Sequence, residues 1–326
     1  MPFKIASTRD LLKGDGTPAF LPAAFDELNR NPDIEWEWLP ETVTEITPDI
    51  AARYDGLHVN LPSVTAASVA RDDCRVKIIA RNGVGFDTVD VAACAAKGIT
   101  VTNTPHAIRR PVAVAALTLI FALAGKLMDK DRLVRTGRWN DRTDFMGTGL
   151  TGRTLGLIGA GGIGQELIPL ARPFFSRVIA ADPHVGTGPL AALGAARVDF
   201  ADLLAQSDFV VAACPLNDVT RHLMNAQAFA AMKPSASFIN VARGPIHDET
   251  ALIAALQSGQ IASAGLDVTE AEPISVTSPL TRMDNVILTP HALCWTDECF
   301  EAIARTALRS IVDVSLGQTP AHVVAG

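Results

Sequence analysis

A glycine-rich turn in the middle of the chain limits its fold more than any other feature. An apolar, strand-like run leads into Gly159, Gly161 and Gly164, which are spaced as G-x-G-x-x-G. Between a strand and a helix, glycines at this spacing let backbone amides approach a diphosphate at the helix N-terminus. The turn therefore predicts a dinucleotide-binding site in an α/β unit, with two further binding residues inside it, Gly162 and Ile163.

An acidic residue downstream strengthens this prediction, because glycine turns alone are common. A second strand-like run ends in Asp182, which follows Gly164 by 18 residues. A carboxylate at this place can accept hydrogen bonds from the adenosine ribose, although it could instead only open the turn Asp182-Pro183-His184. It would also repel a 2′-phosphate, and no arginine follows it directly. The sequence therefore favours NAD over NADP.

Strand-like and helical segments alternate on both sides of the glycine turn. We expect strands at residues 4–6, 56–59, 76–80, 99–102, 154–158, 178–181, 209–213, 237–241, 264–267 and 286–288. We expect helices at residues 19–29, 88–97, 111–127 and 296–316. Short apolar strands separated by helices are typical of doubly wound parallel sheets. The predicted fold class is therefore α/β, with two Rossmann-like or flavodoxin-like lobes.

The length of the chain, 326 residues, suits two such lobes. Because the glycine turn lies in the middle, we expect the NAD-binding Rossmann domain, residues 105–291, to be inserted in a substrate domain. The substrate domain would consist of residues 1–104 and 292–326. The last helix should pack back on the first lobe, and the active site should lie in the cleft between the two lobes.

Charge and cysteine content argue against several other classes of protein. The net charge of -7 gives no drive toward nucleic acid, and no cluster of Lys and Arg suggests a membrane surface. The five cysteines form no C-x-x-C pair, and their odd number argues against a disulfide framework. The apolar segment 111–127 is a little short of the roughly 20 residues that span a membrane. We therefore expect a buried helix there, and a cytoplasmic protein.

Three polar residues that are far apart in the sequence each follow a strand-like run. Arg243, Glu272 and His291 would all lie at carboxyl ends of parallel strands, where doubly wound sheets bind ligands. An arginine can grip a carboxylate with two hydrogen bonds, and a histidine can give a proton to a carbonyl oxygen. A neighbouring carboxylate favours the imidazolium and orients its ring. Taken singly, each residue could instead be a solvated charge, a turn residue or a hydrogen-bonded loop histidine.

The segments around these three residues resemble those of a known family. Residues 238–244, 264–273 and 288–291 are similar to the motifs of the D-isomer-specific 2-hydroxyacid dehydrogenases, which include glyoxylate/hydroxypyruvate reductases and phosphoglycerate dehydrogenases. The resemblance spans about residues 77–290, and its motifs are specific in combination. It implies an NAD-dependent enzyme that moves hydride between a nicotinamide and a small 2-oxo or D-2-hydroxy acid. No metal is implied.

The resemblance assigns roles to the three polar residues and to a turn in the first lobe. Arg243 would bind the substrate carboxylate, His291 would be the acid/base, and Glu272 would be its carboxylate partner. The backbone amides of Val84 and Gly85 would also meet the substrate carboxylate. Alternatively, the glycines of this segment only form a turn.

Further residues are assigned to the cofactor by the same resemblance. Asp267 and the backbone of Ala242 would hold the nicotinamide amide, Val241 would also contact the cofactor, and Cys214 and Pro215 would line the adenine side. Asp267 could instead only cap a strand. The apolar helix that starts near residue 111 resembles a dimer-forming helix, which implies a homodimer.

Four positions are candidates for an unusual substrate pocket. Arg109 and Arg110 stand near the expected start of the long helix, where the helix dipole disfavours positive charge. Our hypothesis is that one of the two, with Arg109 as the candidate, reads a second anionic group on the substrate; the alternative is a solvated pair at a domain hinge. Trp295 stands where relatives usually have small residues, and Asn60 follows a strand of the first lobe, so both could line the pocket.

Two other functions remain open at this stage. An NAD-sensing binding protein of the same fold, resembling a corepressor, would bind NADH without turnover. A formate dehydrogenase would pair its histidine with glutamine, whereas Glu272 is a carboxylate. Glyoxylate, hydroxypyruvate and larger or doubly charged 2-oxo acids all satisfy the requirements of Arg243 and His291.

Overall fold

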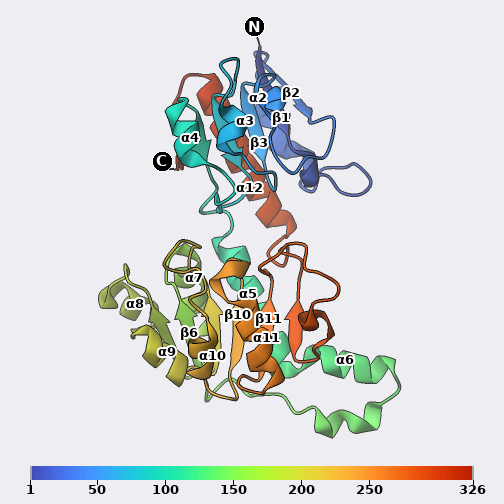
Figure 1. The fold of residues 1–326 in the computed structure, drawn as a ribbon, viewed down its shortest axis with the longest axis vertical. Helices are drawn as coiled ribbons and strands as arrows, with labels where there is room; N and C mark the ends of the chain where they lie inside the picture. Colours follow the sequence, from blue (N-terminus) through green and yellow to red (C-terminus); the bar gives the residue numbers. More distant parts are fainter. Residues whose placement is uncertain (1, 325–326) are drawn as a thin grey trace. The chain divides into compact units, whose positions relative to one another are not determined.

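The computed structural model describes residues 2–324 and divides the chain into two compact units. The first unit combines the chain up to Ile108 with the chain from Trp295 onward, and the second unit is Arg109–Cys294 (Figure 1). In the sequence, the second unit is therefore inserted between the two segments of the first.

The first unit is built on a parallel sheet of five strands in the order β2-β1-β3-β4-β5. Every residue of β3 and β4 is buried, as parallel strands covered on both faces require. This order is that of flavodoxin-like folds. The strands are β1 (Phe3–Ser7), β2 (Ile34–Trp38), β3 (Gly56–Val59), β4 (Ile78–Arg81) and β5 (Thr100–Thr102).

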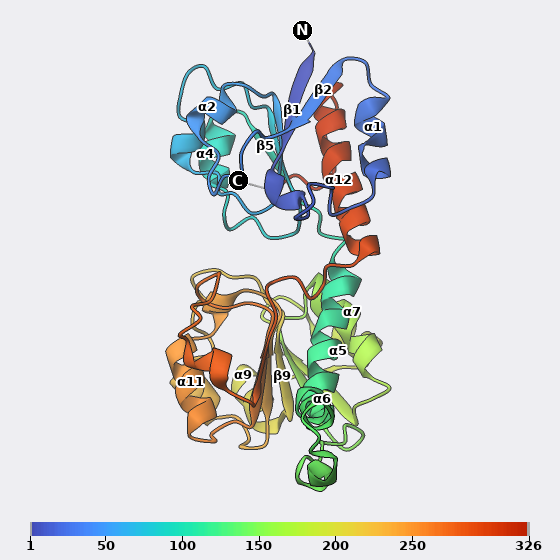
Figure 2. The ribbon, with the colours of Figure 1, turned by 90° about the vertical axis from the view of Figure 1, so that its right-hand side faces the viewer.

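Helices cover both faces of this five-stranded sheet (Figure 2). The C-terminal helix α12 buries Phe300 and Ile311 in the same apolar cluster as Ile5 and Ile78 of the sheet. The predicted packing of the last helix on the first lobe is therefore confirmed. The helices are α1 (Asp26–Asn29), α2 (Pro48–Ala51), α3 (Ala66–Val69), α4 (Val91–Ala96) and α12 (Asp297–Ser315), with 3-10 turns η1 (Arg9–Leu11) and η2 (Pro22–Phe25).

The second unit contains a parallel sheet of seven strands in the order β12-β11-β10-β9-β6-β7-β8. Starting from β6, the chain first builds outward to β8 and then returns to the other side through β9, which is the Rossmann order with one added strand. The predicted α/β class with doubly wound parallel sheets is confirmed. The strands are β6 (Thr154–Ile158), β7 (Arg177–Ala181), β8 (Ala196–Arg197), β9 (Phe209–Ala212), β10 (Ser237–Asn240), β11 (Ser263–Leu266) and β12 (Val286–Leu288).

Two layers of helices enclose the seven-stranded sheet (Figure 2). α5 and α7 lie on one face, and α5 approaches β11 so closely that a Cβ on Gly265 would lie 3.1 Å from Cβ of Leu119. The other face packs Phe238 against Phe229 and Leu252. The helices are α5 (Arg109–Gly125), α6 (Leu127–Arg135), α7 (Gly162–Ala171), α8 (Thr187–Leu193), α9 (Phe200–Gln206), α10 (Ala226–Ala230) and α11 (Glu249–Gln257), with 3-10 turns η3 (Trp139–Asp144), η4 (Gly244–Ile246) and η5 (Pro279–Arg282).

The long apolar segment differs from its prediction as one helix over residues 111–127. α5 ends at Gly125, Lys126 adopts a left-handed backbone with φ of 48°, and α6 continues after a bend of 58°. A left-handed residue interrupts the helical path, which explains the break. Within residues 2–324 no single helix is long and apolar enough to cross a membrane; α5 and α6 pass that test only as a bent pair.

The first 40 residues hold the other difference. The helix expected over residues 19–29 is replaced by the 3-10 turn η2, which has Pro22 at its start, followed by one turn of α1. The sequence reading missed β2, an edge strand in which Glu35 and Glu37 alternate with apolar residues. Its Trp36 stacks on Phe25 at 4.0 Å between ring centroids, and this tertiary contact holds the strand to the first unit.

Candidate active site

The glycine turn joins β6 to α7 with a geometry that only glycine permits. Gly159 has a φ of 92°, and a Cβ on it would lie 2.8 Å from backbone and side-chain atoms of Cys214. A Cβ on Gly164 would lie 2.6 Å from the carbonyl oxygen of Gly159. The first glycine therefore makes the tight turn, and the third allows close packing of helix on strand.

The start of α7 presents the amides that a diphosphate needs. Gly161 is the N-cap, it is exposed, and its carbonyl accepts the first helical hydrogen bond, from Gln165. The amides of Gly162 and Ile163 lie in the first helical turn, where N–H groups have no acceptor within the helix. A helix N-terminus with these amides and a glycine cradle fits the diphosphate of a dinucleotide.

Asp182 lies just beyond β7, beside the glycine turn, and its carboxylate is bound by backbone amides. Oδ2 accepts from Ala160 at 2.7 Å, and Oδ1 accepts from His184 at 2.8 Å and Val185 at 3.0 Å. Burial works to raise the pKa of Asp182, but these three hydrogen bonds outweigh it and the pKa is lowered. The residue thus opens the turn after β7 and also carries a negative charge at the edge of the cradle.

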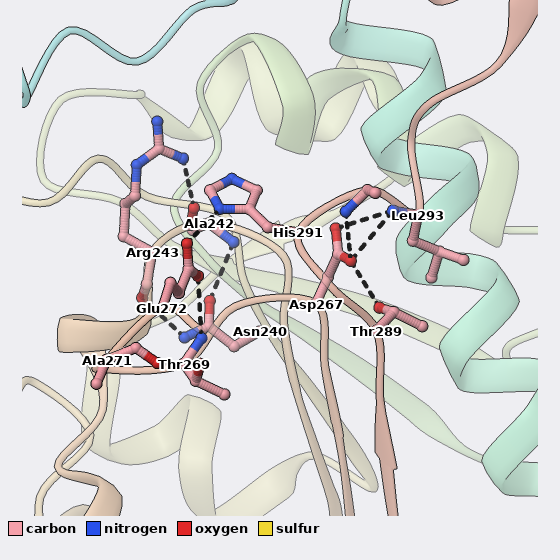
Figure 3. Close-up of polar contacts among 11 residues, drawn as sticks. Asn240, Ala242, Arg243, Asp267, Thr269, Ala271, Glu272, Thr289, His291 and Leu293 are labelled. Carbon is pink, nitrogen blue, oxygen red and sulfur yellow. Dashed lines mark hydrogen bonds and ion pairs between the residues drawn. The ribbon is translucent and has the colours of Figure 1, made fainter. Parts of the chain in front are cut away.

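His291 and Glu272, which are 19 residues apart in the sequence, meet beyond the carboxyl ends of β12 and β11. His291 Nδ1 lies 2.8 Å from Glu272 Oε2, and the side chains are 39% and 41% exposed. Burial works to raise the pKa of Glu272, but the hydrogen bond and charge of His291, the Thr269 amide and the charge of Arg243 outweigh it and lower the pKa. The pair therefore has an ionised carboxylate at one ring nitrogen (Figure 3).

Asp267 fixes the segment that carries His291. Its Oδ1 accepts from Thr289 Oγ1 at 2.6 Å and from the amides of Ala292 and Leu293 at 3.1 Å each (Figure 3). His291 itself has a φ of 54°, a left-handed backbone that is uncommon for a residue with a side chain. The carboxylate that the resemblance assigned to the nicotinamide amide is thus bonded to the segment that carries His291.

Arg243 follows β10, and the turn before it is held by Asn240. Asn240 Oδ1 accepts from the amide of Ala242 at 3.0 Å, and its Nδ2 donates to the carbonyl of Arg243 at 2.9 Å. Arg243 NH1 in turn donates to the carbonyl of Ala242 at 2.7 Å. The backbone of Ala242, which we had expected to hold the nicotinamide amide, is therefore engaged with its neighbours.

A buried histidine stands behind Asn240. Asn240 Nδ2 lies 3.0 Å from Nδ1 of His247, whose side chain is fully buried. Burial lowers the pKa of His247 to about 4, so the ring is neutral and accepts at Nδ1. His247 therefore supports the turn that carries Arg243.

Of the two residues predicted for the adenine side, Cys214 packs against Gly159 of the glycine turn. Cys214 is buried, and burial raises the pKa of its thiol to about 11. The carbonyl of Pro215 accepts from Thr220 Oγ1 at 2.7 Å, which fixes the turn after β9. Val241, which follows β10, is buried. Cys214 thus meets Gly159 as a packing partner, with a thiol that stays protonated near neutral pH.

In the first unit, the predicted substrate residues lie around the ends of β3 and β4. The carbonyls of Val84 and Gly85 accept from Asn103 Nδ2 at 2.8 Å and from Arg81 Nε at 3.1 Å, which orients their turn. Asn60 is buried, and its Nδ2 donates to Asp10 at 2.7 Å, so its amide is engaged inside this unit.

Trp295 opens the second segment of the first unit. Its ring packs on Phe300 of α12 at 4.8 Å between centroids, and the residue is 44% exposed. The indole is thus anchored on α12 with nearly half of its surface open.

Sequence reasoning missed three residues that position the predicted ones: Asn240, His247 and Thr289. Asn240 is visible as a polar residue at the end of a strand. The contacts of His247 and Thr289 depend on how distant segments pack together, and no spacing in the sequence predicts them.

A Rossmann unit with an imidazole–carboxylate pair and an arginine beyond its strands defines a dinucleotide-dependent dehydrogenase. Residues 117–292 match the sequence profile of the D-isomer specific 2-hydroxyacid dehydrogenase, NAD binding domain. The chain belongs to the D-isomer specific 2-hydroxyacid dehydrogenase family and is an NAD-dependent enzyme of that family.

Two relatives and one solved structure illustrate the similarity. The chain is 37% identical over 256 residues to a glyoxylate reductase of Thermococcus litoralis, covering 77% of each chain. It is 37% identical over 288 residues to glyoxylate/hydroxypyruvate reductase B of Shigella boydii, covering 87% of this chain and 88% of that one. An acyclic imino acid reductase in complex with NADPH and D-Arg has a TM-score of 0.85 at 26% identity, covering 99% of this chain and 100% of that one.

Proposed function

We propose that this enzyme reduces a small 2-oxo acid to the D-2-hydroxy acid with NADH, and runs the reverse reaction with NAD. The observation that carries the proposal is the His291–Glu272 pair, with Nδ1 of the imidazole 2.8 Å from the carboxylate. Because Nδ1 faces Glu272, Nε2 is the ring nitrogen that remains for the substrate. Glyoxylate and hydroxypyruvate, named for the relatives, are the first substrates to test.

The chemistry divides between the cofactor and the side chains of the second unit. The reduced nicotinamide supplies a hydride to C2 of the oxo acid. His291 gives the proton from Nε2 to the oxygen on C2, so the carbonyl becomes a hydroxyl, and Glu272 stabilises the imidazolium before the transfer. Arg243 holds the substrate carboxylate through its planar fork of donors, which fixes C2 in one orientation.

We propose NADH over NADPH as the preferred cofactor. The support is the ionised carboxylate of Asp182 at the edge of the glycine cradle, since a negative charge there opposes a 2′-phosphate. The imino acid reductase that shares this fold binds NADPH, so the family fold itself accepts either cofactor. Asp182→Asn keeps an acceptor oxygen but removes the charge. In this variant the ratio of the dissociation constant of NADPH to that of NADH should therefore fall. A wild-type enzyme that binds NADPH as tightly as NADH would contradict the proposal.

We propose that the enzyme is a homodimer that pairs through α5, α6 and the segment after α6. The surface of a monomeric protein rarely exposes many large apolar side chains in one region. This part of the second unit exposes six of them: Phe121, Leu127, Met128, Val134, Trp139 and Met146. Light scattering should give twice the chain mass. The double variant Leu127→Glu/Val134→Glu should give the single mass, and the control Val276→Glu, at a position 84% exposed, should not.

The reaction is tested by following NADH absorbance with a panel of 2-oxo acids that includes glyoxylate, hydroxypyruvate, phenylpyruvate and dicarboxylates. The configuration is determined for each product that is chiral at C2, which glycolate from glyoxylate is not. The proposal predicts turnover with at least one short 2-oxo acid and the D configuration in every chiral product. NADH binding without turnover across the panel would instead favour a sensing protein, and an L product would contradict the D configuration that we propose from the family.

A further inference from the structure

The guanidinium of Arg109 lies against the glycine turn. Arg109 is the first residue of α5, and a Cβ built on Gly162 would lie 2.5 Å from its Nε, 3.0 Å from its Cζ and 3.1 Å from its Cδ. Gly162 is the first residue of α7, so the side chain reaches across from one helix N-terminus to another. The absence of a side chain at Gly162 is what lets Arg109 approach the backbone of the turn.

Positive charge is concentrated at this point of the second unit. The N-termini of α5 and α7 both carry the positive end of a helix dipole, which disfavours cations. Arg110 forms an ion pair through its Nε with Oε1 of Glu166 on α7, which offsets its charge. The Arg109 side chain lies against Gly162, whose amide is one of those that fit a diphosphate. An arginine at two helix N-termini is stabilised when an anion binds between them.

We propose that Arg109 binds a phosphate oxygen of the cofactor's diphosphate at the start of α7. This inference rests on the proposed binding of NADH to the second unit. It assigns Arg109 to the cofactor and replaces the sequence-based hypothesis that Arg109 reads a second anionic group on the substrate. A guanidinium matches phosphate geometry with two donors, and its contribution adds to that of the backbone amides of the turn.

Arg110 provides a matched control. It stands one residue away on the same helix, carries the same charge and is paired with Glu166. Arg109→Gln and Arg110→Gln therefore remove equal charge from the same helix terminus, and only the first removes a donor from the glycine turn. Arg109→Lys keeps the charge without the planar fork and should restore part of the lost affinity.

The test is the dissociation constant of NADH without substrate, measured by fluorescence titration of the enzyme and its variants. Arg109→Gln should weaken the binding of NADH about tenfold, which is the effect of losing one charge-assisted hydrogen bond. Arg110→Gln should weaken it less than about threefold. The slope of the logarithm of this constant against the logarithm of salt concentration should also fall in Arg109→Gln alone. Thermal unfolding midpoints within a few degrees of wild type would show that the variants are folded.

Binding of cofactor fragments distinguishes the loss of a diphosphate contact from a general disturbance of the cofactor site. ADP-ribose contains the diphosphate, so Arg109→Gln should bind it more weakly than wild type does, by the same factor as for NADH. Adenosine lacks the diphosphate and should bind to the variant as tightly as to wild type. Equal loss for both fragments would overturn the proposal in favour of a packing role. Unchanged NADH affinity together with a raised KM for dicarboxylic oxo acids would overturn it in favour of substrate reading. Failure of the wild type to bind NADH would refute the proposed function itself.

Discussion

Two histidines in the two units show how surroundings decide what an imidazole does. His58, in β3 of the first unit, is fully buried, with Nε2 3.0 Å from Asn82 Oδ1 and Nδ1 3.3 Å from Ser7 Oγ. Burial lowers its pKa to about 4, so the ring is neutral near pH 7. Its partners are an amide and a hydroxyl, which a neutral ring satisfies by donating from Nε2 and accepting at Nδ1.

His291, in the second unit, differs in both burial and partner. Its side chain is 39% exposed, and its partner is the ionised carboxylate of Glu272. A carboxylate stabilises a proton on the ring, and exposure lets that proton reach a ligand. His58 thus holds strand ends of its unit as a buried, neutral ring, whereas His291 is an exposed ring beside a charged partner. The two histidines differ in burial and in partner, which is why we propose proton transfer for His291 and not for His58.

The largest effect should come from His291→Ala. Without a proton donor, kcat for oxo-acid reduction should fall by roughly 10²- to 10⁴-fold, the usual contribution of general acid catalysis. The dissociation constant of NADH should stay within about threefold of wild type, because the substitution leaves the glycine turn intact. Steady-state kinetics and a binding titration measure the two quantities. Retention of wild-type kcat would remove His291 from the mechanism.

The buried histidine should instead be visible in the pH dependence of stability. In the folded state His58 takes up a proton only near pH 4, whereas its ordinary pKa is 6.5, so the unfolded chain binds the proton first as pH falls. This difference in pKa contributes on the order of 3 kcal/mol to the free energy of unfolding. The contribution is complete above pH 6.5 and is lost as pH falls toward 4.

Urea unfolding at a series of pH values tests this linkage. His58→Gln keeps a hydrogen-bonding amide that does not titrate, so the free energy of unfolding of this variant should depend less on pH between 6.5 and 4 than that of wild type. Identical pH profiles for the two proteins would show that His58 titrates alike in the folded and unfolded chain.

The smallest effect should come from the residue behind Arg243. Asn240→Ala removes the side chain that bonds Ala242 and Arg243, so Arg243 should be held less firmly and kcat/KM should fall about tenfold. The loss should appear mainly as a raised KM for the oxo acid, because the proton donor is untouched. A fall in kcat alone would place Asn240 in the chemical step instead.

The strands and the edge at which the site forms could be predicted, because they depend on local pattern. The predicted strand positions overlap β6, β7, β9, β10, β11 and β12, since each is a short apolar run between turn residues. Parallel strands bring their carboxyl ends to one edge, which is why Glu272 and His291 could be expected to meet. β2 was missed because it is an edge strand with alternating glutamates.

The supporting contacts could not be predicted, because they depend on backbone conformation and on which elements pack together. The left-handed backbone of Lys126 ends α5, and a lysine at that position does not predict this conformation. The direction of Arg109 depends on the packing of α5 beside α7, which brings its guanidinium to Gly162. Asp267 was assigned to the cofactor by resemblance, whereas its contacts with Thr289 and Leu293 follow from the loop after β12.

The role of Glu272 is tested most directly by kcat/KM for oxo-acid reduction in wild type and in Glu272→Gln, measured at one pH near neutrality. Glutamine keeps the shape of the partner but removes the carboxylate charge beside His291 Nδ1. We expect kcat/KM to fall by about tenfold or more in the variant, while the dissociation constant of NADH stays unchanged. An unchanged kcat/KM would contradict the claim that the Glu272 carboxylate prepares His291 for proton transfer.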